Sequence, residues 1–181
     1  MVMSSKMSPK KLIVLAVIIS MALIIHYLES FIPVPAPGAK LGLANIMLLI
    51  TLVLFGPGEA AIVLLVRSVL GSLLAGNPWS VIYSLSGGLL SLIVMVVLHK
   101  KFGKQVSLAG VSTLGAAFHN IGQLIAASII FGTIGIFYTY LPVLMVFSLF
   151  TGTFTGIAAH FTVGRLTYVI GRSDLQQNRP K

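Results

Sequence analysis

Apolar residues occur in long, nearly uninterrupted blocks along this chain, and short clusters rich in glycine, proline or lysine separate the blocks. A helix needs about 20 apolar residues to cross the hydrocarbon layer of a membrane. On this measure the pattern predicts six transmembrane helices, at about 12–32, 41–55, 60–74, 81–98, 109–134 and 141–170. The expected fold class is therefore all-α, a polytopic membrane protein built as a six-transmembrane-helix bundle.

Three of these blocks depart from the length of a simple span. Blocks 41–55 and 60–74 are short and are joined by a Gly-Pro-Gly turn. Short helices interrupted by glycine or proline border the substrate site in many transporters, although a tilted hairpin in a thinned bilayer explains the same pattern. The last block is longer than a perpendicular span, so we expect it to be strongly tilted, or broken at Gly152, Gly156 or Gly164.

The distribution of positive charge predicts the topology. The blocks define one membrane domain at 12–170, with an N-terminal tail at 1–11 and a C-terminal tail at 171–181. If both tails are cytoplasmic, ten of the 12 Lys and Arg residues fall on the cytoplasmic side, as the positive-inside rule requires. We therefore expect a multi-pass protein of the bacterial plasma membrane. The basic residues form no stripe interleaved with aromatic side chains, so nucleic acid is not an expected partner.

Composition restricts the chemistry that the chain can perform. Only 8% of residues are charged, against about 25% in soluble domains, so a soluble enzyme is excluded. The chain has no Cys, and its acidic residues Glu29, Glu59 and Asp174 are far apart in the sequence. Magnesium-dependent diphosphate chemistry needs clustered carboxylates, and there is no Walker motif for ATP. We expect no enzymatic activity, no catalytic residues, no metal and no cofactor.

Ionisable and amide residues inside the apolar blocks are the candidate binding residues. A charged group at the bilayer centre costs about 2.5 to 3.5 kcal/mol on insertion scales, so Arg67, near the middle of its block, suggests a function. By depth, the side chains that can converge on an outward-facing pocket for a small anionic or polar-headed ligand are His26, Glu29, Lys40, Asn45, Arg67, His119, Asn120 and Gln123. The structural alternative is that Arg67 pairs with Glu29 or backbone carbonyls, while His119 and Gln123 only bond neighbouring helices.

Small residues spaced by four allow helices to approach closely. Ala16 with Ser20 and Gly152 with Gly156 have this spacing. Each pair either holds the bundle together or presents a flat surface to a partner subunit.

Four polar motifs occur in an order and spacing that resemble a known family. They are Glu29-Ser30-Phe31-Ile32-Pro33-Val34-Pro35, Lys40-Leu41-Gly42-Leu43-Ala44-Asn45-Ile46, Arg67-Ser68-Val69-Leu70-Gly71-Ser72-Leu73-Leu74 and Phe118-His119-Asn120-Ile121-Gly122-Gln123. The chain resembles the Gx transporter family, which also carries the label heptaprenyl diphosphate synthase component I. The resemblance covers nearly all of the chain except its tails.

The resemblance implies a fold similar to the S components of energy-coupling-factor transporters, which are six-helix bundles with an extracellular-facing pocket. In such transporters small residues of the first helix contact a transmembrane coupling subunit attached to ATPases. Ala16 and Ser20 are the matching positions, and Ser20 departs from the usual alanine. Because the three carboxylates of the chain are far apart in the sequence, we interpret the synthase label as the name of an association in which this chain is not catalytic.

Two functions follow as expectations. The first is a substrate-binding membrane subunit that captures a small anionic, vitamin-like or isoprenoid-like solute from outside, for uptake driven by a separate ATPase module. The second is a non-catalytic accessory subunit of an isoprenoid, quinone or flavin-linked redox system, with a prenyl synthase or redox protein as its partner.

Overall fold

The computed structural model describes residues 9–33, 40–103 and 105–170. Residues 1–8 of the predicted N-terminal tail at 1–11, and the predicted C-terminal tail at 171–181 with Asp174, lie outside this part of the chain, whereas residues 9–11 already belong to α1. Within it the order of helices is α1 (Pro9–Glu29), α2 (Asn45–Leu54), α3 (Pro57–Leu74), α4 (Ser80–Phe102), α5 (Leu108–Ile130) and α6 (Gly135–Ile170). The predicted all-α fold with six helices is thus confirmed for the described residues.

The helices differ in their ability to cross a membrane. Five of them, all except α2, are long and apolar enough to do so, and α2 has only ten residues, or about 15 Å of helix. Of the six expected transmembrane helices, five thus have the length and apolar character to span, and α2 is shorter than the already short block 41–55. The five long apolar helices are compatible with a multi-pass membrane protein.

Helix α2 is short because its predicted first turn is unwound. Hydropathy placed the start of this helix at Leu41, but residues 40–44 are not helical and the helix begins at Asn45. Gly42 has a φ of 78°, in the left-handed region that side chains with a Cβ disfavour. At the other end Gly56, with a φ of 107°, ends the helix before Pro57 starts α3.

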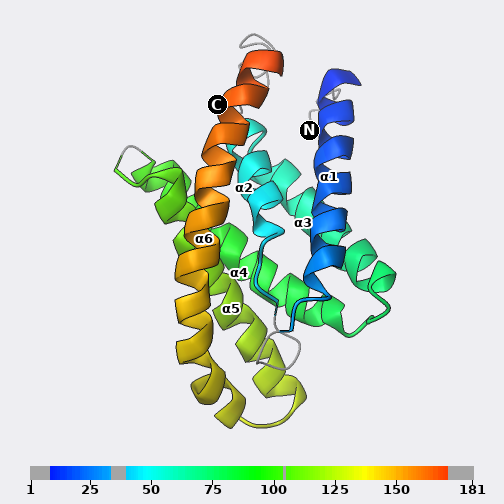
Figure 1. Ribbon diagram of the computed structural model, residues 1–181, viewed down its shortest axis with the longest axis vertical. Helices are drawn as coiled ribbons and strands as arrows, with labels where there is room; N and C mark the ends of the chain where they lie inside the picture. Colours follow the sequence, from blue (N-terminus) through cyan, green and yellow to red (C-terminus); the bar gives the residue numbers. More distant parts are fainter. Residues whose placement is uncertain (1–8, 34–39, 104, 171–181) are drawn as a thin grey trace, which may run out of the picture.

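Helix α2 lies in the middle of the bundle. Eight of its ten residues are buried, and it contacts α1, α3, α4, α5 and α6. In Figure 1 it occupies the half of the molecule where α1 begins and α6 ends, and the unwound segment continues from it toward the other end. We call these ends the terminal side and the opposite side.

An apolar core fills the bundle on the terminal side. It includes side chains of α2, α3, α4 and α5 that are almost completely buried, namely Leu48, Leu49, Leu64, Met95 and Val111. Lys11 at the start of α1 forms an ion pair with Glu59 at the start of α3. The packed core and this ion pair close the terminal side of the bundle.

Helix α6 is continuous from Gly135 to Ile170, so the break considered at Gly152, Gly156 or Gly164 does not occur. A Cβ added to Gly152 would lie 2.5 Å from Thr113 Cα, and one added to Gly156 would lie 2.5 Å from Ala109 Cα. The spaced glycines therefore hold α6 against α5, and they are not a surface for a partner.

Other helix ends also differ from the hydropathy estimate. Helix α1 ends at Glu29 instead of residue 32, and α5 ends at Ile130 instead of residue 134. Helix α4 continues to Phe102 through most of the predicted basic loop, and α6 begins at Gly135 before its Pro142. Turns and interhelical packing decide where these helices end, and a count of apolar residues does not detect either of them.

We predict that Gly156→Ala lowers the stability of the bundle, because the added methyl group meets the backbone of α5. Overpacking of this kind costs about 1 to 3 kcal/mol, measurable as a lower unfolding temperature in detergent. Gly164→Ala is the matched control on the same helix, since a Cβ there meets nothing within 4 Å. Equal stability of the two variants would contradict the close packing of α5 and α6.

Candidate functional site

The eight candidate binding residues come from four helices and one loop. His26 and Glu29 lie in the last turns of α1, Lys40 in the following loop, Asn45 at the start of α2, Arg67 in α3, and His119, Asn120 and Gln123 in α5. Seven of them are buried and Lys40 is half-buried. None of the eight side chains lies exposed on the outer surface of the bundle.

The unwound segment before α2 is attached to its neighbours by three of these residues. Glu29 Oε1 accepts a hydrogen bond of 2.9 Å from the backbone N–H of Leu43. Lys40 Nζ lies 2.7 Å from His26 Nε2, and the backbone N–H of Lys40 donates to Gln123 Oε1 at 3.1 Å. Because these partners belong to α1 and α5, the segment is held between the two helices.

Arg67 is the most deeply placed charge of the site, with 1% of its surface exposed. Its Nη2 donates to Asn45 Oδ1 at 2.8 Å, whereas its Nε has no hydrogen-bond partner. Arg67 forms no salt bridge with Glu29, although both residues are described. The direct ion pair of the structural alternative is thus not formed between these two residues, although the Glu29 charge is near enough to act on the guanidinium.

The three α5 residues face two different directions. Gln123 Nε2 lies 3.0 Å from His119 Nε2, so these residues share one helix face as their spacing predicted. Asn120 Nδ2 instead donates to the carbonyl of Leu144 in α6 at 2.9 Å. The structure therefore brings His119 and Gln123 to the unwound segment, and it uses Asn120 to join α5 to α6.

Some buried polar atoms near α2 have no hydrogen-bond partner. They are Asn45 Nδ2 and Arg67 Nε, whereas His119 Nδ1 faces Gly87 of α4. A Cβ placed on Gly42 would lie 2.9 Å from Asn45 Nδ2 and 3.2 Å from His119 Cδ2, so both side chains border the same glycine. Buried polar groups are almost always paired in folded proteins, and a cluster of unpaired ones is suited to an additional hydrogen-bonding group.

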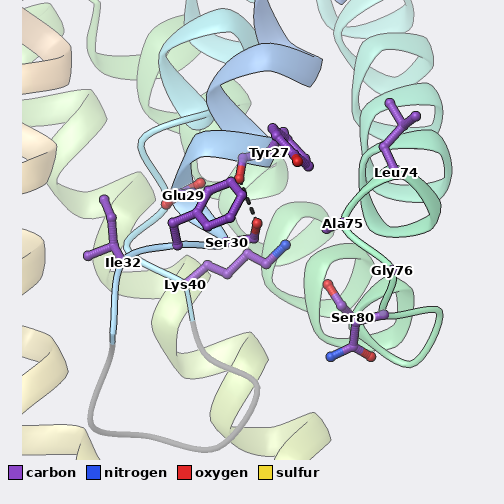
Figure 2. A pocket seen from close by; sticks show the side chains of 11 residues that line it. Tyr27, Glu29, Ser30, Ile32, Lys40, Leu74, Ala75, Gly76 and Ser80 are labelled. Carbon is purple, nitrogen blue, oxygen red and sulfur yellow. Dashed lines mark hydrogen bonds between the residues drawn. The ribbon is translucent and has the colours of Figure 1, made fainter.

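A cavity of about 490 Å³ opens on the opposite side of the bundle, beside the residues Glu29 and Lys40 that contact the unwound segment or belong to it. Figure 2 shows Glu29 and Lys40 together with the turn between α3 and α4, where Ala75, Gly76 and Ser80 lie, and Lys40 extends toward that turn. Glu29 and Lys40 are the candidate residues that line the cavity. The other candidates lie deeper or behind them, with His26 in contact with Lys40.

Sequence reasoning missed most of the cavity wall. Tyr27 and Phe31 line it with their rings 5.1 Å apart in an edge-to-face contact, and Ser80 lines it from α4. Ser80 bonds Ser72 of α3 at 3.1 Å, and one turn deeper Ser68 bonds Ser84 at 2.9 Å. The recurrence of serine at spacings of four on both helices was a usable signal, because it marks one polar face on each helix.

Burial lowers the pKa of the Lys40 ammonium to about 8, and the nearby Arg67 charge acts in the same direction. The Glu29 carboxylate works against this by favouring the charged amine. The Lys40 side chain at the cavity wall thus loses its positive charge at mildly alkaline pH.

Ala16 and Ser20 lie apart from this site, on an exposed face of α1. Ser20 Oγ donates to the backbone carbonyl of Ala16 at 2.9 Å, so the serine hydroxyl is already bonded within its own helix. Both small side chains leave the helix surface open to a neighbouring helix.

Comparison with protein families gives a match to one described as Heptaprenyl diphosphate synthase component I, over residues 18–162. No match was found among curated proteins or solved structures. The matched segment contains all eight candidate binding residues and most of each helix. This chain therefore belongs to the heptaprenyl diphosphate synthase component I family.

Proposed function

We propose that this chain is the substrate-binding membrane subunit of a transporter and captures a small anionic solute from the side opposite its termini. The observation that carries the proposal is the 490 Å³ cavity lined by Lys40 and Glu29, with Asn45 and Arg67 buried in the same bundle and each holding an N–H donor that has no partner. Solute pockets of this size are common, and cationic side chains inside a membrane bundle usually serve a ligand or an ion.

The interrupted second helix supports the same function. Transporter sites are often built from broken helices, where the positive end of a helix dipole near the middle of the membrane faces the substrate. The first N–H groups of α2 are bonded to the carbonyls of residues 42–44, so the dipole is the part of this arrangement that α2 offers. Helix α2 begins at Asn45, within the bundle, and Asn45 contacts Arg67. The positive end of the α2 dipole thus lies beside the guanidinium, and both favour a negatively charged group.

The closed terminal side supports capture without free passage. Residues of the apolar core such as Leu64 and Met95 fill the bundle between the site and the terminal side. Release on that side requires the bundle to rearrange, which needs an energy source. The sequence has no Walker motif, so in this proposal the energy comes from separate ATPases, as in the S components that the chain resembles.

Catalysis by this chain is not part of the proposal. Glu29 and Glu59 lie near opposite ends of the bundle, since Glu59 pairs with Lys11 at the beginning of α1 and the 18 residues from Lys11 to Glu29 span about 27 Å of helix. Carboxylates this far apart do not share a magnesium ion.

The description of the family favours a second function. It names a component of a prenyl diphosphate synthase, and the cavity wall contains apolar residues such as Ile32 and Leu74. In this alternative the chain is a non-catalytic subunit that holds an isoprenoid or quinone for a soluble or redox partner.

We predict that Arg67→Met abolishes retention of the solute, because it removes the buried charge at nearly constant volume. Native mass spectrometry of the detergent-purified chain would measure the retained small molecule. Arg165→Met, at an exposed position of α6, is the control and should retain it. Unchanged retention by Arg67→Met would remove Arg67 from the site and defeat the proposal.

We predict that Ala16→Leu with Ser20→Leu prevents copurification of a transmembrane coupling subunit and its ATPases, since larger side chains keep a partner helix at a distance. Gly164→Leu, an exposed position of α6, should leave copurification unchanged. Identification of a prenyl synthase or redox protein in place of the ATPases would support the accessory function instead.

We predict that affinity for an anionic solute falls about tenfold between pH 7 and pH 9, because a lysine with a pKa of about 8 loses its charge over this interval. Isothermal titration at several pH values would measure the change. Lys40→Arg keeps its charge throughout, so its affinity should stay constant over the same range. A similar decline in that variant would assign the pH dependence to another group.

A further inference from the structure

The charged residues of the membrane domain can be counted from the sequence. Residues 12–98 contain four charged side chains, Glu29, Lys40, Glu59 and Arg67, and residues 105–164 contain none. Glu59 is paired with Lys11 on the terminal side. The opposite half of the bundle therefore holds two cations and one anion, a surplus of one positive charge.

This surplus charge lies inside the protein. Arg67 is 1% exposed and has no carboxylate partner within the described residues. Glu29 is 3% exposed and uses one oxygen to accept from the Leu43 N–H. The Glu29 charge acts on both Arg67 and Lys40 and balances one of these two cations. The second cation is left without a counter-ion, which is unfavourable inside the bundle, and a bound ligand with one negative charge would cancel it.

The wall of the cavity indicates the rest of the ligand. Tyr27, Phe31, Ile32 and Leu74 supply aromatic and apolar surface, Ser30, Asn77 and Ser80 supply neutral polar groups, and Lys40 and Glu29 are its charged lining residues. Because Glu29 balances one of the two cations, a second negative charge on the ligand would exceed the positive charge of this half of the bundle. A neutral apolar or aromatic body fits this lining.

We infer that the site takes a monocarboxylate with an apolar or aromatic body and rejects diphosphates. The inference rests on the proposed function, and it specifies the charge of the solute. A diphosphate brings two or more negative charges, which proteins balance with several cations or with a carboxylate-bound magnesium ion. One surplus cation balances a single carboxylate. The ligand therefore differs in charge from the product that the family description names.

The ligand side of the inference is tested with compounds that share one body. The full chain in neutral detergent at pH 7 is titrated with geranate, geranamide and geranyl diphosphate, and with 4-phenylbutyrate and its amide as an aromatic pair. We expect at least one carboxylate to bind tenfold or more tightly than its amide, and geranate more tightly than the diphosphate. The inference is overturned by equal binding of acid and amide, by tighter binding of the diphosphate, or by no binding of either acid.

An anionic phospholipid also carries one negative charge and is a second source of the same chemistry. The titration is therefore repeated in nanodiscs of phosphatidylcholine with and without phosphatidylglycerol. Carboxylate binding that is unchanged by phosphatidylglycerol supports a soluble ligand. Loss of carboxylate binding in its presence would assign the site to the lipid headgroup and overturn the inference.

Charge variants test the protein side. Lys40→Gln reduces the surplus to zero, so the preference for geranate over geranamide should disappear. Glu29→Gln raises the surplus to two and should increase the affinity for geranyl monophosphate severalfold. Lys100→Gln, at an exposed position at the end of α4, removes a charge far from the cavity and should keep the original preference. An unchanged preference in Lys40→Gln would overturn the inference.

The two proposals fail in different ways. If Arg67→Met loses a retained solute but the chain does not distinguish carboxylates from amides, the substrate-binding function stands and the charge assignment is wrong. If the carboxylate preference is present and Arg67→Met retains its solute, the proposed function fails, and the charge assignment stands with Lys40 as the binding cation.

Discussion

The guanidinium of Arg67 lies inside an apolar helical bundle, and the surrounding elements are arranged to accommodate that charge. At the start of α2, Asn45 Oδ1 lies 2.8 Å from Arg67 Nη2. The N-terminal end of a helix carries a partial positive charge, so the start of α2 does not neutralise the guanidinium. Glu29 makes no direct ion pair with Arg67, and one of its carboxylate oxygens accepts from Leu43 in the unwound segment. The bundle therefore buries a cation on which the nearest carboxylate acts only from beyond ion-pair distance.

The polar side chains around Arg67 also explain how the bundle tolerates the unwound segment before α2. Unwound backbone inside a membrane protein needs hydrogen-bond partners, and these are usually supplied by other helices. Here Glu29 of α1 accepts from Leu43, and Gln123 of α5 accepts from Lys40. The polar side chains thus have two roles, since they hold the segment in place and form the wall or floor of the site. A ligand that competes for Lys40 or Glu29 would also loosen the segment.

The two halves of the bundle are built differently. Interlocking apolar side chains and the Lys11–Glu59 ion pair close the terminal side. On the opposite side, serine pairs between α3 and α4 and the cavity beside Lys40 replace the apolar packing. An asymmetric bundle of this kind is suited to receiving a solute from one side only. The close approach of α6 to α5 at Gly152 and Gly156 provides a rigid support behind the site.

The sequence by itself determined the helical class, five of the helices and the identity of the polar residues in the bundle, because helix formation in a membrane depends on local hydropathy. It also determined the charge count, since so few charged residues occur. Only the tertiary structure decided that α2 begins at Asn45, that Glu29 binds Leu43 instead of Arg67, and that Asn120 faces α6. These features depend on hydrogen bonds between residues up to 83 positions apart, such as Lys40 and Gln123, and no local pattern encodes such partners.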